Sequence, residues 1–134
     1  MAGVSDAVTN PQVLVIGLDP FRVPGPWDPA PVAEAIGAGM PDLADRGYDA
    51  ESCLVALDGS DDIEAHLSRA LVARPWDCVV VGGGIRKEEE LLELFESVVN
   101  RVRILAPQAA IAFNGTPRDL PDAVARSLRG GFRN

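Results

Sequence analysis

The chain has 134 residues, of which 47% are hydrophobic and 24% are charged, and its formal net charge is −8. This length and composition predict a single globular domain, residues 1–134, that can bury a core, with flexible ends at 1–11 and 131–134. The acidic balance argues against nucleic acids and anionic membranes as partners, because both need a basic face. No apolar run approaches the roughly 20 residues of a membrane span, and the N-terminus does not resemble a signal peptide, so we expect a cytoplasmic protein.

The chain opens with a predicted strand at 13–17, a continuous apolar run that is typical of a strand covered on both faces. A long link follows at 19–31, which holds five prolines together with Phe21, Arg22 and Trp27. Links of this length between a strand and a helix are unusual and often functional. The link either closes over a ligand, with Trp27 stacking on a flat molecule, or packs on the domain as a stiffened loop.

The spacing of apolar residues predicts a helix over 30–46, which we expect Pro41, together with Gly37 and Gly39, to break or kink. The next apolar run predicts a strand at 52–57. Asp61, with Glu64 three residues later, matches the pattern that caps a helix start, so a second helix is expected from that point.

A third strand is predicted at 78–82, and it ends in the three glycines Gly82–Gly84. A helix with a regular apolar stripe is predicted over 87–105, with acidic residues in its first turns and basic residues in its last turns, as the helix dipole favours. A fourth strand is predicted at 109–113 and a last helix from about 121 to 130.

Four strands alternating with helices through short links predict an α/β fold, a three-layer sandwich whose four-stranded parallel sheet has the order 2-1-3-4. This winding is flavodoxin-like or Rossmann-like, and it places the ligand crevice at the carboxyl ends of strands 1 and 3. The first strand would separate Cys53 from Cys78, so both are expected to be buried free thiols.

Residues that follow the predicted strands are the candidates for a ligand site at this edge. Asp19 and Asp58 either form a carboxylate pair for Mg²⁺ or a ribose hydroxyl, or serve only as turn residues. Asn114 bonds either a ligand or its own loop, and Thr116 resembles a helix cap. The full set of predicted ligand-binding residues is Asp19, Asp58, Gly83, Gly84, Arg86, Asn114 and Thr116.

The three glycines allow two interpretations. Glycines let a backbone approach a phosphate, or they form a tight turn in which a positive φ would exclude β-branched residues. Glu88–Glu90 would repel a phosphate, and Arg86 and Lys87 compensate only in part. Neither G-x-G-x-x-G nor the P-loop pattern is present, and the single histidine, His66, argues against a catalytic triad or a histidine metal site.

The segments VLVIGLDP, WDCVVVGGGIR, LLELFESVVN and APQAAIAFNGTP, which cover 13–20, 76–86, 91–100 and 106–117, resemble a group of short uncharacterised bacterial proteins. The resemblance implies a Rossmann-like fold and no known activity.

Three functions remain open at this point. The first is a module, regulatory in character, that binds a small molecule or nucleotide-like ligand at the carboxyl edge of the sheet. The second is an interaction module that works as a homodimer without a ligand, since the predicted third helix carries surplus apolar residues, Leu92, Leu94 and Val99, and the fourth strand is a sheet edge. The third is a Mg²⁺-dependent enzyme that uses Asp19 and Asp58. The residues name no cofactor.

Overall fold

A computed structural model describes residues 10–130, so most of the predicted flexible ends lies outside the described residues. The sheet has four parallel strands in the order β2-β1-β3-β4, as predicted. The strands are β1 (Gln12–Leu18), β2 (Asp49–Val55), β3 (Cys78–Val81) and β4 (Ala110–Phe113). The edge strand β2 begins three residues before its predicted start, because its first residues, Asp49–Glu51, pair with the backbone of β1. Asp49 and Glu51 are polar and exposed, so they do not continue the apolar run.

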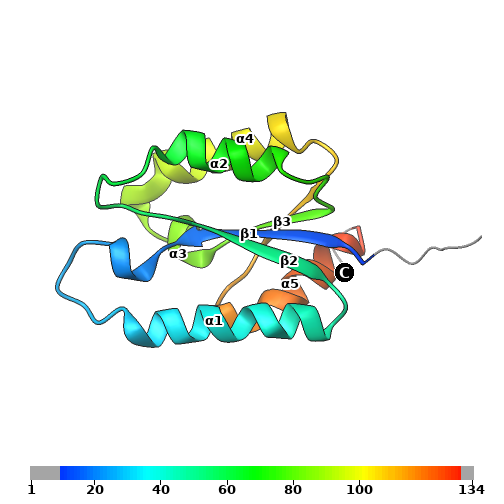
Figure 1. The fold of residues 1–134 in the computed structure, drawn as a ribbon, viewed down its shortest axis with the longest axis horizontal. Helices are drawn as coiled ribbons and strands as arrows, with labels where there is room; N and C mark the ends of the chain where they lie inside the picture. Colours follow the sequence, from blue (N-terminus) through cyan, green and yellow to red (C-terminus); the bar gives the residue numbers. More distant parts are fainter. Residues whose placement is uncertain (1–9, 131–134) are drawn as a thin grey trace, which may run out of the picture.

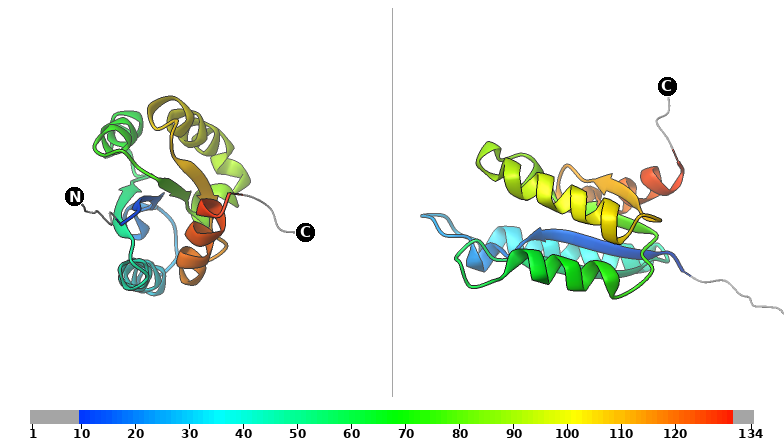
Figure 2. Two further views of the ribbon diagram at one scale, coloured as in Figure 1. Left: turned by 90° about the vertical axis from the view of Figure 1, so that its right-hand side faces the viewer. Right: turned by 90° about the horizontal axis from the view of Figure 1, so that it is seen from above.

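Helices cover both faces of this sheet. Figure 1 shows α2 and α4 on one face and α1 and α5 on the other, and the end-on view in Figure 2 shows the same three layers. A flavodoxin-like or Rossmann-like α/β sandwich is therefore confirmed. The helices are α1 (Ala30–Asp45), α2 (Ile63–Val72), α3 (Gly83–Arg86), α4 (Leu92–Leu105) and α5 (Leu120–Leu128), with 3-10 turns η2 (Pro20–Arg22), η3 (Glu89–Leu91) and η4 (Pro117–Asp119).

Alternation along the strands divides the interior into two cores. Leu14 and Ile16 of β1 lie in the core beneath α2 and α4, whereas Val13 and Val15 lie in the core beneath α1 and α5. All four side chains are buried. Because both faces of β1 are covered, its sequence is a continuous apolar run rather than an alternating one.

Of the break or kink predicted at Pro41, the break is wrong, since α1 runs through this residue as one helix. Proline removes the hydrogen bond to the carbonyl four residues earlier and crowds that residue. Here that residue is Gly37, which is exposed and whose Cβ position is open. Its carbonyl can therefore meet solvent, and the helix continues to Asp45, two residues before Gly47, where φ is +87°.

The predicted cap of the helix after β2 is also corrected. Asp62, not Asp61, caps α2 by accepting a hydrogen bond from Ala65 N. Asp61 is occupied elsewhere, with the backbone of Ala56 and the guanidinium of Arg22.

The helix predicted over 87–105 begins later than expected, because α4 begins only at Leu92, and the separate short helix α3 precedes it at Gly83–Arg86. Glu89 and Glu90 belong to the separate turn η3, so they do not form the first turn of the long helix.

The expectation for the cysteines is confirmed. Cys53 in β2 and Cys78 in β3 are free and buried, with β1 between their strands. Burial, with a smaller effect from the Asp61 carboxylate, raises the pKa of the Cys53 thiol to about 11. Burial also raises the pKa of Cys78, whose sulfur lies 3.2 Å from the Ser127 hydroxyl. Both thiols are therefore protonated near neutral pH.

No helix between residues 10 and 130 is long and apolar enough to cross a membrane.

Candidate functional site

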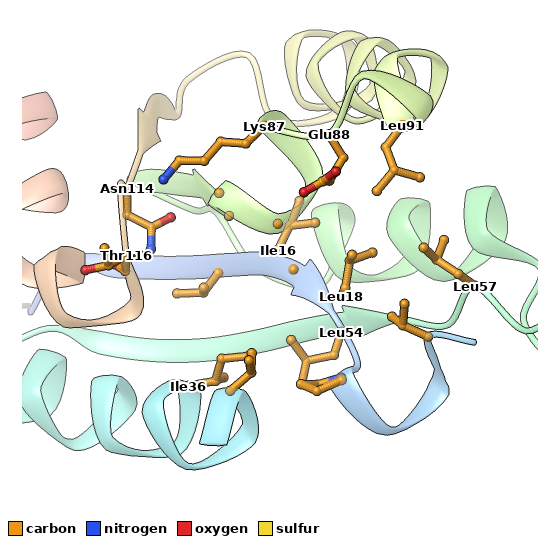
Figure 3. A pocket seen from close by; sticks show the side chains of 18 of the residues that line it. Ile16, Leu18, Ile36, Leu54, Leu57, Lys87, Glu88, Leu91, Asn114 and Thr116 are labelled. Atoms are coloured by element: carbon orange, nitrogen blue, oxygen red, sulfur yellow. Dashed lines mark hydrogen bonds between the residues drawn. The ribbon is translucent and has the colours of Figure 1, made fainter. Parts of the chain in front are cut away.

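A pocket of about 740 Å³ lies at the carboxyl ends of all four strands, at the edge where the topology predicted a ligand crevice. Figure 3 shows its lining, to which each strand end contributes. Leu54 and Leu57 come from β2 and its loop, Leu18 comes from β1, and Asn114 follows β4. The volume is within the usual range for small-molecule sites, roughly 300–1,000 Å³.

The end of the pocket over β1 and β2 is apolar. Leu18, Leu54 and Leu57 lie together there, as Figure 3 shows, and Ile36 of α1 forms part of the wall. The long link after β1 adds further apolar lining, including Trp27, whose indole N–H donates a hydrogen bond to Val23 O at 3.1 Å. Trp27 lines the pocket and remains 40% exposed, so the link borders the cavity rather than packing only on the domain.

Backbone hydrogen bonds fix the two loops at this apolar end. Asp19 N donates to Val55 O at 2.9 Å, and Leu57 N donates to Arg22 O at 3.0 Å. The Arg22 guanidinium also pairs with Asp19 at 2.9 Å and with Asp61 at 3.2 Å. The link after β1 is thereby tied to the loop after β2.

The carboxylates of the predicted Mg²⁺ pair make local contacts. Asp19 accepts hydrogen bonds from Phe21 N and Arg22. Asp58 accepts from the N–H and hydroxyl of Ser60, and these bonds lower the pKa of Asp58. Neither carboxylate lines the pocket. Within residues 10–130, no group of three or more His, Cys, Asp or Glu residues could hold a metal ion. The structure therefore matches the interpretation of these residues as turn residues.

The three glycines allow close backbone packing rather than a positive φ. Among the described glycines, positive φ occurs only at Gly25, Gly47, Gly59 and Gly130. A Cβ on Gly82 would lie 3.2 Å from Ile16 O, and a Cβ on Gly83 would lie 3.2 Å from Gly115 O. A Cβ on Gly84 would meet only the Leu18 side chain, at 3.7 Å. The expectation of a positive-φ turn is corrected, because Gly83 and Gly84 form the first turn of α3 and line the pocket beside the loop after β4.

Asn114 is the one buried polar residue among those described, with only 5% of its surface exposed, and it lines the pocket. Its Nδ2 donates to Thr116 O at 2.7 Å, which fixes the orientation of the carboxamide. The oxygen Oδ1 is buried, and no donor within residues 10–130 reaches it. In Figure 3, this oxygen is directed toward the interior of the pocket. Asn114 therefore bonds its own loop through one atom and presents the other to the cavity.

Two basic residues hold the loop after β4. Arg86 donates to Asn114 O at 3.1 Å, and Lys87 Nζ donates to Gly115 O at 2.5 Å. Arg86 does not line the pocket, whereas Lys87 and its neighbour Glu88 do. Thr116 also contributes to the lining, and its hydroxyl caps η4 by accepting from Arg118 N, as predicted.

Of the predicted site residues, the pocket therefore brings together Gly83, Gly84, Asn114 and Thr116, and it leaves out Asp19, Asp58 and Arg86. Lys87 also lines the pocket but is absent from the predicted set, because the helix predicted over 87–105 was expected to begin there. Leu18, the last residue of β1, and Leu57, two residues beyond the end of β2, are also absent from that set, although apolar residues at strand ends are a visible signal of a covered edge.

The chain matches no protein-family model, no curated protein and no solved structure. The resemblance to a group of short bacterial proteins therefore stays a prediction.

Proposed function

We propose that this protein binds a small molecule in the pocket at the carboxyl edge of its sheet. The observation that carries the proposal is the cavity itself, an opening of about 740 Å³ lined mainly by apolar side chains with a few polar groups. Small-molecule sites have this composition, because apolar walls supply the affinity and a small number of polar atoms orient the ligand.

The same lining favours an apolar ligand over the nucleotide-like alternative. Glu88 and Glu90 both line the pocket and would repel phosphate groups. Among the described residues, Lys87 is the one basic residue that lines the pocket, so a single positive charge stands against these two negative charges.

A neutral fluorescent dye tests the proposal. Nile red, whose emission rises in apolar surroundings, should bind the purified protein saturably with one site per chain. Ile36→Trp should abolish that binding because the larger ring fills the cavity from α1. The control is Leu128→Trp, which adds the same ring on α5 at a side chain that is 38% exposed and outside the pocket.

Circular dichroism and melting temperature establish that both variants are folded. Saturable binding that Ile36→Trp removes and Leu128→Trp retains would support the proposal. Absence of saturable binding to the unmodified protein, or equal binding by all three proteins, would refute it.

A further inference from the structure

We propose that the ligand of this pocket is an uncharged, mainly apolar molecule that carries an amide-type group, with an N–H donor beside a carbonyl oxygen. The inference rests on the proposed function and adds the chemical class of the ligand.

The N–H donor is inferred from Asn114. Its Oδ1 is a buried acceptor with no donor among the described residues, on a side chain that is 95% buried and directed into the cavity. Leaving such an acceptor unpaired costs stability, whereas a ligand donor would satisfy it. The hydrogen bond from Nδ2 to Thr116 O identifies the free atom as oxygen, so the ligand must supply a hydrogen rather than a lone pair.

The carbonyl oxygen is inferred from Lys87. Figure 3 shows its amino group at the same end of the pocket as Asn114. One N–H of Lys87 Nζ is used by Gly115 O, and an ammonium group has three. A remaining N–H can donate to a ligand acceptor next to the group that meets Asn114. An amide presents a donor and an acceptor side by side, so it fits this pair.

The absence of net charge on the ligand is inferred from the charged residues that line the pocket. Glu88 also lines the pocket, and in Figure 3 its carboxylate lies near the middle of the cavity. An anionic ligand would be repelled by Glu88 and Glu90, and a cationic group placed against Asn114 would be repelled by Lys87. A neutral dipolar group avoids both costs.

The apolar body of the ligand then extends from β4 toward β2. The polar end lies over the loop after β4, and Leu18, Leu54 and Leu57 lie at the opposite end. Three strand spacings separate β2 from β4 in the order β2-β1-β3-β4, which corresponds to about 14 Å. This span fits an alkyl chain or a ring system attached to one amide.

A matched pair of probes tests the inference. Octanamide and methyl heptyl ketone have the same chain and the same carbonyl group, but the ketone has a methyl group where the amide has NH2. Octanoate has the same chain with a negative charge. Each is titrated into the full-length protein as a competitor of Nile red and by calorimetry.

We expect the unmodified protein to bind octanamide about tenfold more tightly than the ketone, with octanoate also weaker than the amide. Asn114→Leu, which removes the acceptor at similar volume, should abolish the preference for amide over ketone. Lys87→Met should weaken both carbonyl probes by a similar factor and leave their ratio unchanged.

Equal binding of octanamide and the ketone by the unmodified protein would overturn the inference, and so would a preference that survives in Asn114→Leu. If Asn114→Leu fails to fold, the probe pair on the unmodified protein decides. The two proposals fail separately. Saturable Nile red binding with no amide preference refutes only the ligand class, whereas no saturable binding of Nile red refutes the site.

Discussion

Gly83→Ala should destabilise the protein, although alanine is the better helix former. The new Cβ would lie 3.2 Å from Gly115 O and 3.4 Å from Asn114 O, closer than carbon and oxygen normally approach. The neighbouring loop cannot easily retreat, because Asp119 holds Gly115 N and Lys87 holds Gly115 O. Overpacking of this kind costs about 1–3 kcal/mol, and replacing a helical glycine returns about 0.5–1 kcal/mol.

With the middle value of each range, the expected net loss is about 1 kcal/mol, or roughly 2–8 °C in melting temperature for a domain of this size. Gly84→Ala is the matched control one residue later in the same short helix. Its Cβ would meet only a flexible leucine at ordinary contact distance, so the helix preference should dominate and stability should rise by about 0.5–1 kcal/mol.

Urea unfolding monitored by circular dichroism measures both changes, provided that the slope m is unchanged. Opposite signs at two adjacent glycines would show that backbone proximity at Gly83 determines the effect. Equal stabilisation of both variants would refute the argument, because it would mean that the loop after β4 yields freely.

Further predictions concern the cores, α1 and self-association. The pKa of Cys53 is raised from 9.0 to about 11, so the folded state favours the neutral thiol. The neutral Cys53 thiol therefore contributes fully to the free energy of unfolding below about pH 9. This contribution is lost between about pH 9 and 11, because the thiol ionises first in the unfolded chain. Urea unfolding at pH 8 and 10 should show a smaller alkaline loss in Cys53→Val than in the unmodified protein, and equal losses would contradict this assignment. Pro41→Ala should raise stability by about 1–3 kcal/mol because it restores a helix hydrogen bond on an exposed face, and a lower urea midpoint would contradict the interpretation of α1. We expect a symmetric homodimer that Leu92→Glu and Val99→Glu weaken, and a monomer at all micromolar concentrations in sedimentation would refute it.

The strands and their order were predictable because they depend on local patterns. Continuous apolar runs such as 13–17 and 78–81 mark strands covered on both faces, and short links restrict the topology to parallel neighbours. The extra length of β2 was not predictable, because its polar residues are held only by pairing with another strand.

The details of the site could not be predicted from the sequence, because they depend on contacts between distant segments. Asp61 and Asp62 are equally plausible caps in the sequence, and the choice is made by Ala56 and Arg22, which occupy Asp61. Asn114 was predicted as a candidate, but its unpaired oxygen follows from the bond between Nδ2 and Thr116. Loop residues are assigned poorly from local patterns, since their positions are set by the scaffold they border.

The pocket is lined in part by glycine backbone and in part by side chains, and this difference determines where substitutions can change its ligand specificity. Part of the lining is backbone at Gly82 and Gly83, where an added side chain would meet a carbonyl oxygen, whereas the apolar end includes residues of the links, such as Trp27 and Leu57. These two residues belong to neither buried core cluster. Substitution at either position therefore reshapes the cavity without altering the interior of the sandwich. One scaffold can in this way accommodate ligands of different shape while its folding determinants stay constant.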